Sequence, residues 1–351
     1  MSGAVGSASR FGDDDLWFAL WIDIATGVWL VLDSNELDIH SKTIQIPQNT
    51  KKAVLEIYVS SHGNDEFWYS NPPNSYIEQN NLTTQRGNGA FRQVFATVDG
   101  VTVGSATPFP VSYTGGINPL FWEPVVAIGA FNLPTYDFDL TPFLGFLLDG
   151  KNHSFGLGVT DSISFWLIKG KREIEYSGWV NSSAGNFTTP ITEKFKFKNK
   201  IKIKNYGQEN QVKQKIKVKT EIIVENEIGQ EISKLSISRK YPLKIKISTL
   251  PGADKDTFLS ITNVSHSLEE TYTSRSLSSN EGVEISVENS QDSGGWMLVK
   301  DHSVIWGTGS TAQTYSYQDQ NGHYSRVVYA ANGKILQDNS TLTSASSSFS
   351  A

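Results

Sequence analysis

The sequence predicts an all-β protein, and three observations support this prediction. Beyond Ser41, short runs rich in Val, Ile, Phe, Tyr and Thr are separated by clusters of Gly, Pro and Asn, which is the pattern of strands joined by turns. No stretch has the apolar spacing of a long amphipathic helix. With 351 residues, of which 38% are hydrophobic and 19% charged, the chain is long enough for two packed domains.

The N-terminal half contains five expected strands, at Ala53–Ser60, Phe91–Val98, Val101–Val103, Val125–Phe131 and Ser154–Ile168. Asp99 and Gly100 stand between the second and third of these. Both residues tolerate the positive φ of a type I′ turn, so they predict a tight hairpin. Leu140–Leu148 fits a short helix as well as a strand.

The composition changes near Lys171, and the small, polar stretch Asn181–Thr189 indicates a linker. We therefore expect a divergent apolar segment at 1–40, a first β domain at 41–170, a linker at 171–190 and a second β domain at 191–351.

Lysine occupies every second position from Lys194 to Lys204 and again from Lys213 to Lys219, with apolar residues between many of them. This period of two predicts a hairpin with one apolar face and one lysine face, and Leu243–Ile247 predicts a further strand of the same kind. Residues 194–249 hold 15 basic and 5 acidic side chains, a local net charge of +10 in a chain whose net charge is −6.

Two interpretations of the lysine face remain open. A row of ammonium groups would attract an anionic surface, but lysines also keep a sheet soluble and discourage edge pairing. The lysine rows contain no Arg, and Phe195 and Phe197 alternate with the lysines and so belong to the opposite face. No aromatic or Arg side chain on the lysine face can stack bases, and we expect no nucleic-acid partner.

The chain contains no cysteine, which excludes disulfides, thiolate zinc sites, iron–sulfur ligation and cysteine nucleophiles. The apolar run Leu16–Leu32 is interrupted by Asp23 and preceded by three aspartates, so it makes a poor export signal, and we expect no stable membrane insertion. Six Asn-X-Ser/Thr triplets are candidate glycosylation sites and favour a secreted protein: Asn81, Asn152, Asn181, Asn186, Asn263 and Asn339.

The densest group of reactive side chains is Ser61–Pro73, which follows directly on an apolar strand. Its three consecutive aromatics, including Trp68 and Tyr69, offer flat faces for sugar rings, and Asn64 offers an amide that can hydrogen-bond hydroxyl or acetamido groups. Such a loop suits carbohydrate.

If the site is hydrolytic, Asp65 or Glu66 is the general base and His62 orients it. Adjacent residues on an extended chain point in opposite directions, so we expect only one of the two carboxylates to face the substrate. The competing interpretation is an Asx-type turn, with the aromatic residues packed as core.

Two further segments contain candidate groups. Trp122 and Glu123 set an aromatic ring beside a carboxylate, although such rings are more often core than ligand platforms. Asp137 and Asp139 lie two residues apart on one face of a strand, where paired carboxylates could raise one another's pKa, but a solvated turn fits them better.

Long strings of this sequence resemble the peptide N-glycosidase A type of plants and fungi, the acidic peptide-N-(N-acetylglucosaminyl)asparagine amidases. The resemblance extends from about Ser41 to the C-terminus. It rests on SHGNDEFWYSNPP at Ser61, GNGAFRQVFATVDG at Gly87, the long string from Phe109, HSFGLGVTDSISFWL at His153 and KFKFKNKIKIKN at Lys194.

This resemblance implies two antiparallel, jelly-roll-like β-sandwich domains and a secretory-pathway hydrolase, extracellular or vacuolar. The enzyme would act on N-glycosylated peptides or proteins, cleaving the amide between the innermost N-acetylglucosamine and asparagine without a cofactor or metal ion. Asp65 and Glu66 remain the candidate bases, with Glu123 in reserve. An oxyanion donor could be His62, Asn64 or Arg92.

This chain departs from the resemblance in two places. Residues 1–36 look unrelated, and after Ile168 the sequence passes quickly to Trp179 where the family continues through a longer region, so the first sandwich could be incomplete. A non-catalytic glycan-binding protein derived from the same family is therefore the alternative function.

Overall fold

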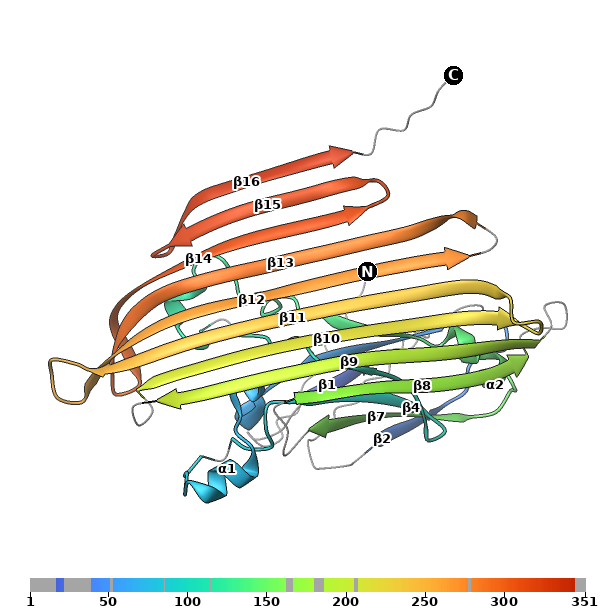
Figure 1. Ribbon diagram of the computed structural model, residues 1–351, viewed down its shortest axis with the longest axis horizontal. Helices are drawn as coiled ribbons and strands as arrows, with labels where there is room; N and C mark the ends of the chain where they lie inside the picture. Colours follow the sequence, from blue (N-terminus) through green and yellow to red (C-terminus); the bar gives the residue numbers. More distant parts are fainter. Residues whose placement is uncertain are drawn as a thin grey trace, which may run out of the picture.

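The computed structural model describes residues 17–21, 39–50, 53–84, 86–113, 115–161, 167–179, 186–204, 208–276 and 279–344. Within these residues the fold consists of antiparallel strands in three sheets, joined by loops and a few short helical turns (Figure 1). The prediction of an all-β antiparallel fold is confirmed.

Two small sheets form a sandwich in the N-terminal half. One has the order β1-β3-β6 and the other β2-β7-β4-β5. Their bounds are β1 Trp17–Trp21, β2 His40–Ile44, β3 Val54–Ser60, β4 Arg92–Val98, β5 Val101–Ala106, β6 Thr135–Asp139 and β7 His153–Asp161. Alternate residues of β3 and β4, such as Leu55, Ile57, Val94 and Ala96, are buried between the sheets, as the period of two requires.

A single nine-stranded sheet holds the rest of the chain, in sequential order from β8 to β16 (Figure 1). Its strands are β8 Leu167–Trp179, β9 Asn186–Lys204, β10 Glu209–Asn226, β11 Glu231–Pro251, β12 Thr257–Ser276, β13 Ser279–Lys300, β14 Ser303–Asp319, β15 Gly322–Ala331 and β16 Lys334–Ser344. Each strand pairs with its neighbour in the chain, because every connection is a hairpin.

The loops of the N-terminal half cover one face of this large sheet. Their aromatic residues, among them Trp68, Phe109 and Phe121, form one core cluster with Ile216 and Tyr241 of β10 and β11. We call these loops the covering layer.

Polar side chains of the large sheet fasten the covering layer to it. Asn199 Nδ2 donates to the Tyr69 carbonyl at 3.0 Å, and Gln214 Nε2 donates to the Ala90 carbonyl at 3.0 Å. All four residues are buried, so each bond satisfies a backbone carbonyl that water does not reach.

The short helices lie in the loops around the small sandwich. They are α1 Asn74–Gln79 and α2 Leu144–Leu147, with 3₁₀ turns η1 Gly63–Asp65, η2 Trp68–Ser70, η3 Pro119–Phe121 and η4 Thr141–Phe143. Of the two interpretations of Leu140–Leu148, the helical one is therefore confirmed. None of the described helices is long and apolar enough to cross a membrane.

Both expected turn signals form hairpins. Asp99 and Gly100 have φ of 48° and 81° between β4 and β5, as a type I′ turn requires. Lys213 of β10 pairs with Lys200 of β9, which places the two lysine rows on one face as predicted.

Two expectations from the sequence were wrong. Val125–Phe131 forms turns and bends instead of a strand: Ala127 and Ile128 are buried in the covering layer without a strand partner, whereas Phe131 is exposed. The expected linker at 171–190 lies largely in β8 and β9, which pair with each other, and 180–185 lies outside the described residues.

The second domain also differs from expectation. Its described strands belong to one sheet, and the layer packed against that sheet comes from the N-terminal half. The apolar faces of the lysine strands are buried against this layer, so the two halves share a core.

Candidate active site

The motif loop, residues 61–73, begins where β3 ends and winds back on itself through η1 and η2. Gly63 adopts a φ of 55°, and the Asp65 N–H then donates to the His62 carbonyl at 2.9 Å. Because the chain turns here, Asp65 and Glu66 are not the extended neighbours that the sequence suggested.

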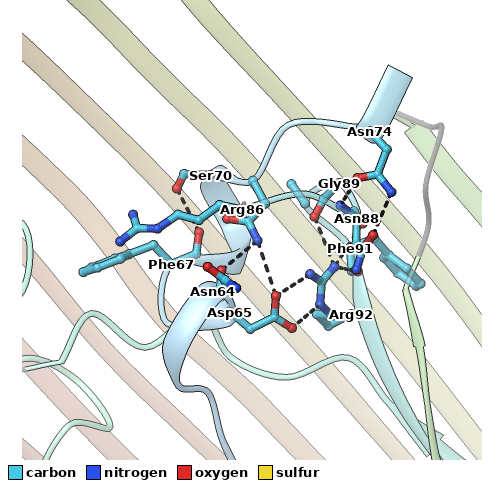
Figure 2. A network of polar contacts seen from close by, with 12 residues as sticks. Asn64, Asp65, Phe67, Ser70, Asn74, Arg86, Asn88, Gly89, Phe91 and Arg92 are labelled. Carbon is cyan, nitrogen blue, oxygen red and sulfur yellow. Dashed lines mark hydrogen bonds and ion pairs between the residues drawn. The ribbon is translucent and has the colours of Figure 1, made fainter. Parts of the chain in front are cut away.

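Asp65 and Arg92 form a two-point ion pair beneath this loop (Figure 2). Arg92 Nε donates to Asp65 Oδ2 at 2.8 Å and Arg92 Nη2 donates to Asp65 Oδ1 at 2.6 Å. The two side chains are 4% and 16% exposed for Arg92 and Asp65. Arg92 Nη1 donates to the carbonyls of Asn88, Gly89 and Phe91. The N–H groups of the Arg92 guanidinium are thus used within the protein, where they hold one carboxylate and three backbone carbonyls in a fixed geometry.

Asn64 also contributes to this internal network through its backbone. Asn71 Nδ2 donates to the Asn64 carbonyl at 3.1 Å and to Asp65 Oδ1 at 3.3 Å. Asp65 is therefore held by the side chains of Arg92 and Asn71, and not by the loop backbone amides of the Asx-type turn that was the competing interpretation.

The turn at Gly87–Gly89, whose carbonyls accept hydrogen bonds from Arg92, is itself held in place by Asn74 (Figure 2). The Asn88 N–H donates to Asn74 Oδ1 at 2.7 Å, and Asn74 Nδ2 returns a bond to Asn88 Oδ1 at 2.9 Å. A Cβ on Gly87 would lie 2.2 Å from Asn74 Oδ1, so glycine is needed there for close approach. This explains why the string GNGAFRQ accompanies the motif loop.

Glu66 and His62 are the polar groups of the loop that remain open to solvent. Glu66 is half-buried, and its carboxylate makes no hydrogen bond or ion pair with any residue that the structure describes. His62 is exposed and stacks on the ring of Tyr113, with 6.2 Å between centroids and 16° between planes. Ser60 Oγ lies 2.8 Å from His62 Nε2 and 3.2 Å from the Tyr113 hydroxyl.

Three aromatic rings that were candidates for sugar binding, two in the motif loop and Trp122, are core residues. Trp68 and Tyr69 are each 1% exposed and Trp122 is 2% exposed. They are buried because the large sheet packs against them, and the Trp122 Nε1 donates to the Gly116 carbonyl at 3.1 Å. Their faces are not open to a ligand. The aromatic ring of the loop that reaches the surface is Phe67, whose face is covered by the Arg86 guanidinium at 5.3 Å from the centroid.

Glu123 lies in a different part of the molecule from the motif loop. It is exposed, and its neighbour Phe121 accepts a hydrogen bond at 2.7 Å from Thr311 of β14, whereas Tyr69 is bonded to Asn199 of β9. The Glu123 carboxylate lies beside the turn between β15 and β16, where its Oε2 would be 3.9 Å from a Cβ on Gly333. No contact joins Glu123 to Asp65 or Glu66 among the described residues.

Sequence reasoning missed a pair of carboxylates on the outer face of the three-stranded sheet. Glu56 of β3 stands directly opposite Asp137 of β6 in the strand register, and the Tyr58 hydroxyl donates to Glu56 Oε1 at 3.0 Å. Burial, and then the negative charge of Glu56, raise the pKa of Asp137 above its usual value. The expected partner, Asp139, instead caps the next turn by accepting from the Thr141 N–H at 2.9 Å.

A second polar group, on β11 and β12 of the large sheet, lies within electrostatic reach of Asp137. Arg239 Nε lies 3.4 Å from Glu270 Oε1, and Glu270 also accepts hydrogen bonds from the hydroxyls of Tyr241 and Tyr272. The charges of Arg239 and Glu270 both act on Asp137. The signal that could have found this group is the spacing of two residues between Arg239 and Tyr241 and between Glu270 and Tyr272, which places each pair on one face of a strand.

His266 is a buried histidine beneath Trp122. Its Nε2 lies 2.9 Å from Gln291 Oε1, and burial lowers its pKa to about 4. The ring is therefore neutral at pH 7, with the proton on Nε2. Among the residues that the structure describes, no three His, Asp or Glu side chains gather in an arrangement that could hold a metal ion.

Comparison with known proteins assigns the family. The family described as peptide N-acetyl-beta-D-glucosaminyl asparaginase amidase A matches residues 23–184, and the C-terminal domain of the same family matches 167–243. The chain belongs to the peptide N-glycosidase A family. The first match begins at residue 23, inside the segment expected to be unrelated, and the second begins with β8, where the large sheet starts.

Peptide-N4-(N-acetyl-beta-glucosaminyl)asparagine amidase A of Prunus dulcis is 37% identical to this chain over 357 residues. The alignment covers 89% of this chain and 61% of the almond protein, so the chain spans less than two thirds of that peptide N-glycosidase A. No solved structure matches the chain.

Proposed function

We propose that this protein hydrolyses the amide bond between the innermost N-acetylglucosamine and asparagine of N-glycoproteins and N-glycopeptides. The observation that carries the proposal is the match of the family to the small sandwich and to the first strands of the large sheet. The reaction adds water across the amide, leaving aspartate in the peptide and releasing the glycan as a glycosylamine.

Glu66 is the proposed general base. Its carboxylate lies at the surface without a protein partner among the described residues, so it is free to accept a proton from the attacking water. His62, four residues before it and exposed, is the proposed donor to the developing oxyanion. Asp65 and Arg92, which the sequence also suggested for these roles, hold each other and fix the shape of the loop.

The Glu56–Asp137 pair is the competing position for the chemistry. A carboxyl group with a raised pKa can protonate a leaving nitrogen, while its neighbour remains ionised. A site at Glu66 and a site at the Glu56–Asp137 pair predict opposite effects on activity for Glu66→Gln and Asp137→Asn, so one assay decides between the two sites.

The assay incubates the folded protein with a defined N-glycopeptide at mildly acidic pH and follows the peptide mass for the Asn-to-Asp change. We expect Glu66→Gln to lower the rate by about 10²–10⁴-fold, because general-base catalysis contributes about that factor. Glu78→Gln, at an exposed position of the nearby helix α1, is the matched control and should keep the wild-type rate. Loss of activity in Asp137→Asn together with a normal rate in Glu66→Gln would move the site to the Glu56–Asp137 pair.

Glycan binding without turnover by the folded wild-type protein would favour the non-catalytic alternative. Trp68→Ala cannot test it, because truncating a ring that is 1% exposed costs about 3–5 kcal/mol of stability. Phe67→Ala, at a ring that reaches the surface, is the appropriate variant for measuring a loss of glycan affinity.

A secretory location is proposed as well. The asparagines at positions 81, 152, 263 and 339 are exposed, so an attached glycan would meet no packing obstacle there. Asn181 and the side chain of Asn186 lie outside the described residues. A mass decrease after enzymatic removal of glycans from the native protein would support this location.

A further inference from the structure

The large sheet carries a hollow of about 690 Å³, and none of the side chains proposed for catalysis lines it. Five exposed lysines line it, namely Lys198, Lys200, Lys213, Lys215 and Lys244. These residues alternate with buried ones such as Ile216 and Ile245, which pack against the covering layer. The lysines and the hollow are therefore on the opposite face of the sheet from the motif loop.

The lysines of the hollow stand directly opposite one another. Lys213 of β10 pairs in register with Lys200 of β9 on one side and with Lys244 of β11 on the other. Neighbouring strands are about 4.8 Å apart, so three ammonium-bearing side chains start within about 10 Å. Like charges directly opposite each other in a sheet are destabilising, so this arrangement costs the folded state free energy.

Carboxylates of the same chain pair with lysines beside the hollow, but not with the lysines that line it. Lys240 is paired with Glu269 at 2.8 Å, and Lys219 with Glu221 at 3.0 Å. Within the described part of the chain, none of the five lysines of the hollow forms an ion pair. The carboxylate nearest to them in the lining, Asp292, accepts a hydrogen bond from Ser265.

Protection of a sheet edge does not explain these lysines. The edge strands are β8 and β16, whereas β9, β10 and β11 are paired on both sides. Lysine discourages unwanted strand pairing only where backbone groups are unpaired. A ligand with repeated negative charges would explain both the position and the repulsion of the lysines.

We propose that the hollow binds a carboxylate-bearing polysaccharide. The ammonium groups repeat at about 7 Å along each strand and about 4.8 Å between strands, which suits a chain whose acidic groups also repeat. Hydroxyls of Ser265 and Ser267 on β12, and the Ser290 hydroxyl and Asp292 carboxylate on β13, line the hollow beside the lysine strands and can hydrogen-bond sugar hydroxyls.

The lining favours this ligand over other polyanions. It contains no Arg and no Phe, Tyr or Trp side chain, the groups on which nucleic-acid bases stack. Asp292 would oppose the dense phosphates of a nucleic acid but accepts hydrogen bonds from hydroxyl groups. The proposal does not depend on the amidase activity, because the hollow and the motif loop are on opposite faces of the sheet.

Calorimetric titration of the full chain with oligogalacturonic acid at low ionic strength tests the proposal. We expect the triple variant Lys200→Gln, Lys213→Gln, Lys244→Gln to bind about tenfold more weakly, since it loses three exposed charge contacts, each of which contributes modestly. The triple variant should also be at least as stable as wild type, because it relieves repulsion. The control Lys42→Gln, Lys255→Gln, Lys334→Gln changes the net charge equally at exposed positions elsewhere and should keep wild-type affinity.

Several outcomes would overturn the proposal. Equal affinity of the triple variant and the control variant would show that net charge alone attracts the probe. Equal binding of the uncharged methyl ester would show that carboxylates are not recognised. Tighter binding of single-stranded DNA or poly-glutamate of matched charge would assign the hollow to a different class of ligand.

Discussion

The Asp65–Arg92 pair determines the shape of the motif loop, because it joins the loop to the start of β4. We expect Asp65→Asn to lower the free energy of unfolding by about 3–5 kcal/mol, since it leaves the Arg92 guanidinium buried without a counter-charge. Urea denaturation measures the change. Glu66→Gln, which removes no contact among the described residues, should lie within about 0.5 kcal/mol of wild type. Equal stability of the two variants would contradict this role for Asp65.

His266 gives the fold a pH dependence. Its pKa is about 4 in the folded protein, whereas an unburied histidine ring has a pKa of 6.5, so the unfolded state binds the proton more tightly. The stability that the neutral ring contributes is present above pH 6.5 and is lost as the pH falls toward 4. The loss amounts to roughly 3 kcal/mol.

His266→Gln should therefore have a flatter profile of unfolding free energy between pH 7 and pH 4 than wild type. Replacing the exposed His302 with Asn should leave the wild-type profile unchanged. Parallel profiles for wild type and His266→Gln, measured by urea denaturation across this range, would show that His266 does not cause the pH dependence.

At the scale of elements, close backbone contact docks the covering layer on the large sheet. The turn η3 lies directly on β14, where a Cβ on Gly309 would be 2.3 Å from the Leu120 carbonyl oxygen. Gly309→Ala should destabilise the protein by about 1–3 kcal/mol, because the backbone of η3 would have to shift. In Gly294→Ala, on the adjacent strand, the new methyl meets only the end of the Asn263 side chain at 3.1 Å. A cost for Gly294→Ala as large as for Gly309→Ala would argue against this docking contact.

The sequence was sufficient for those elements whose signal is local. The Asp99–Gly100 turn and the lysine hairpin follow from residue types within a few positions. By contrast, Val125–Phe131 has strand-like composition but packs as a loop, because only part of it, including Ala127 and Ile128, is buried in the cluster shared with the large sheet.

The candidate site was harder to predict, because it depends on strand pairing between distant segments. Glu56 and Asp137 face each other only through the register of β3 and β6. Trp68 and Trp122 were expected at the surface because their burial is caused by the large sheet, more than 70 residues later in the chain. The choice of Glu66 over Asp65 required the position of Arg92.

At the scale of the whole molecule, the large sheet separates two kinds of surface. One face is covered by the N-terminal half, which carries the motif loop and its carboxylates, and the other presents the lysines. The concentration of lysines within residues 194–249 is therefore a property of one face, whereas Arg239 of the same segment is buried on the other face, toward the N-terminal half.

The most direct test of the central claim is hydrolysis of a defined N-glycopeptide in water enriched in oxygen-18. The account predicts a product peptide whose new aspartate carries one heavy oxygen from the solvent, formed by the wild-type protein and by Glu78→Gln but not by folded Glu66→Gln. An unchanged glycopeptide after incubation with folded wild-type protein, or equal conversion by Glu66→Gln, would contradict it.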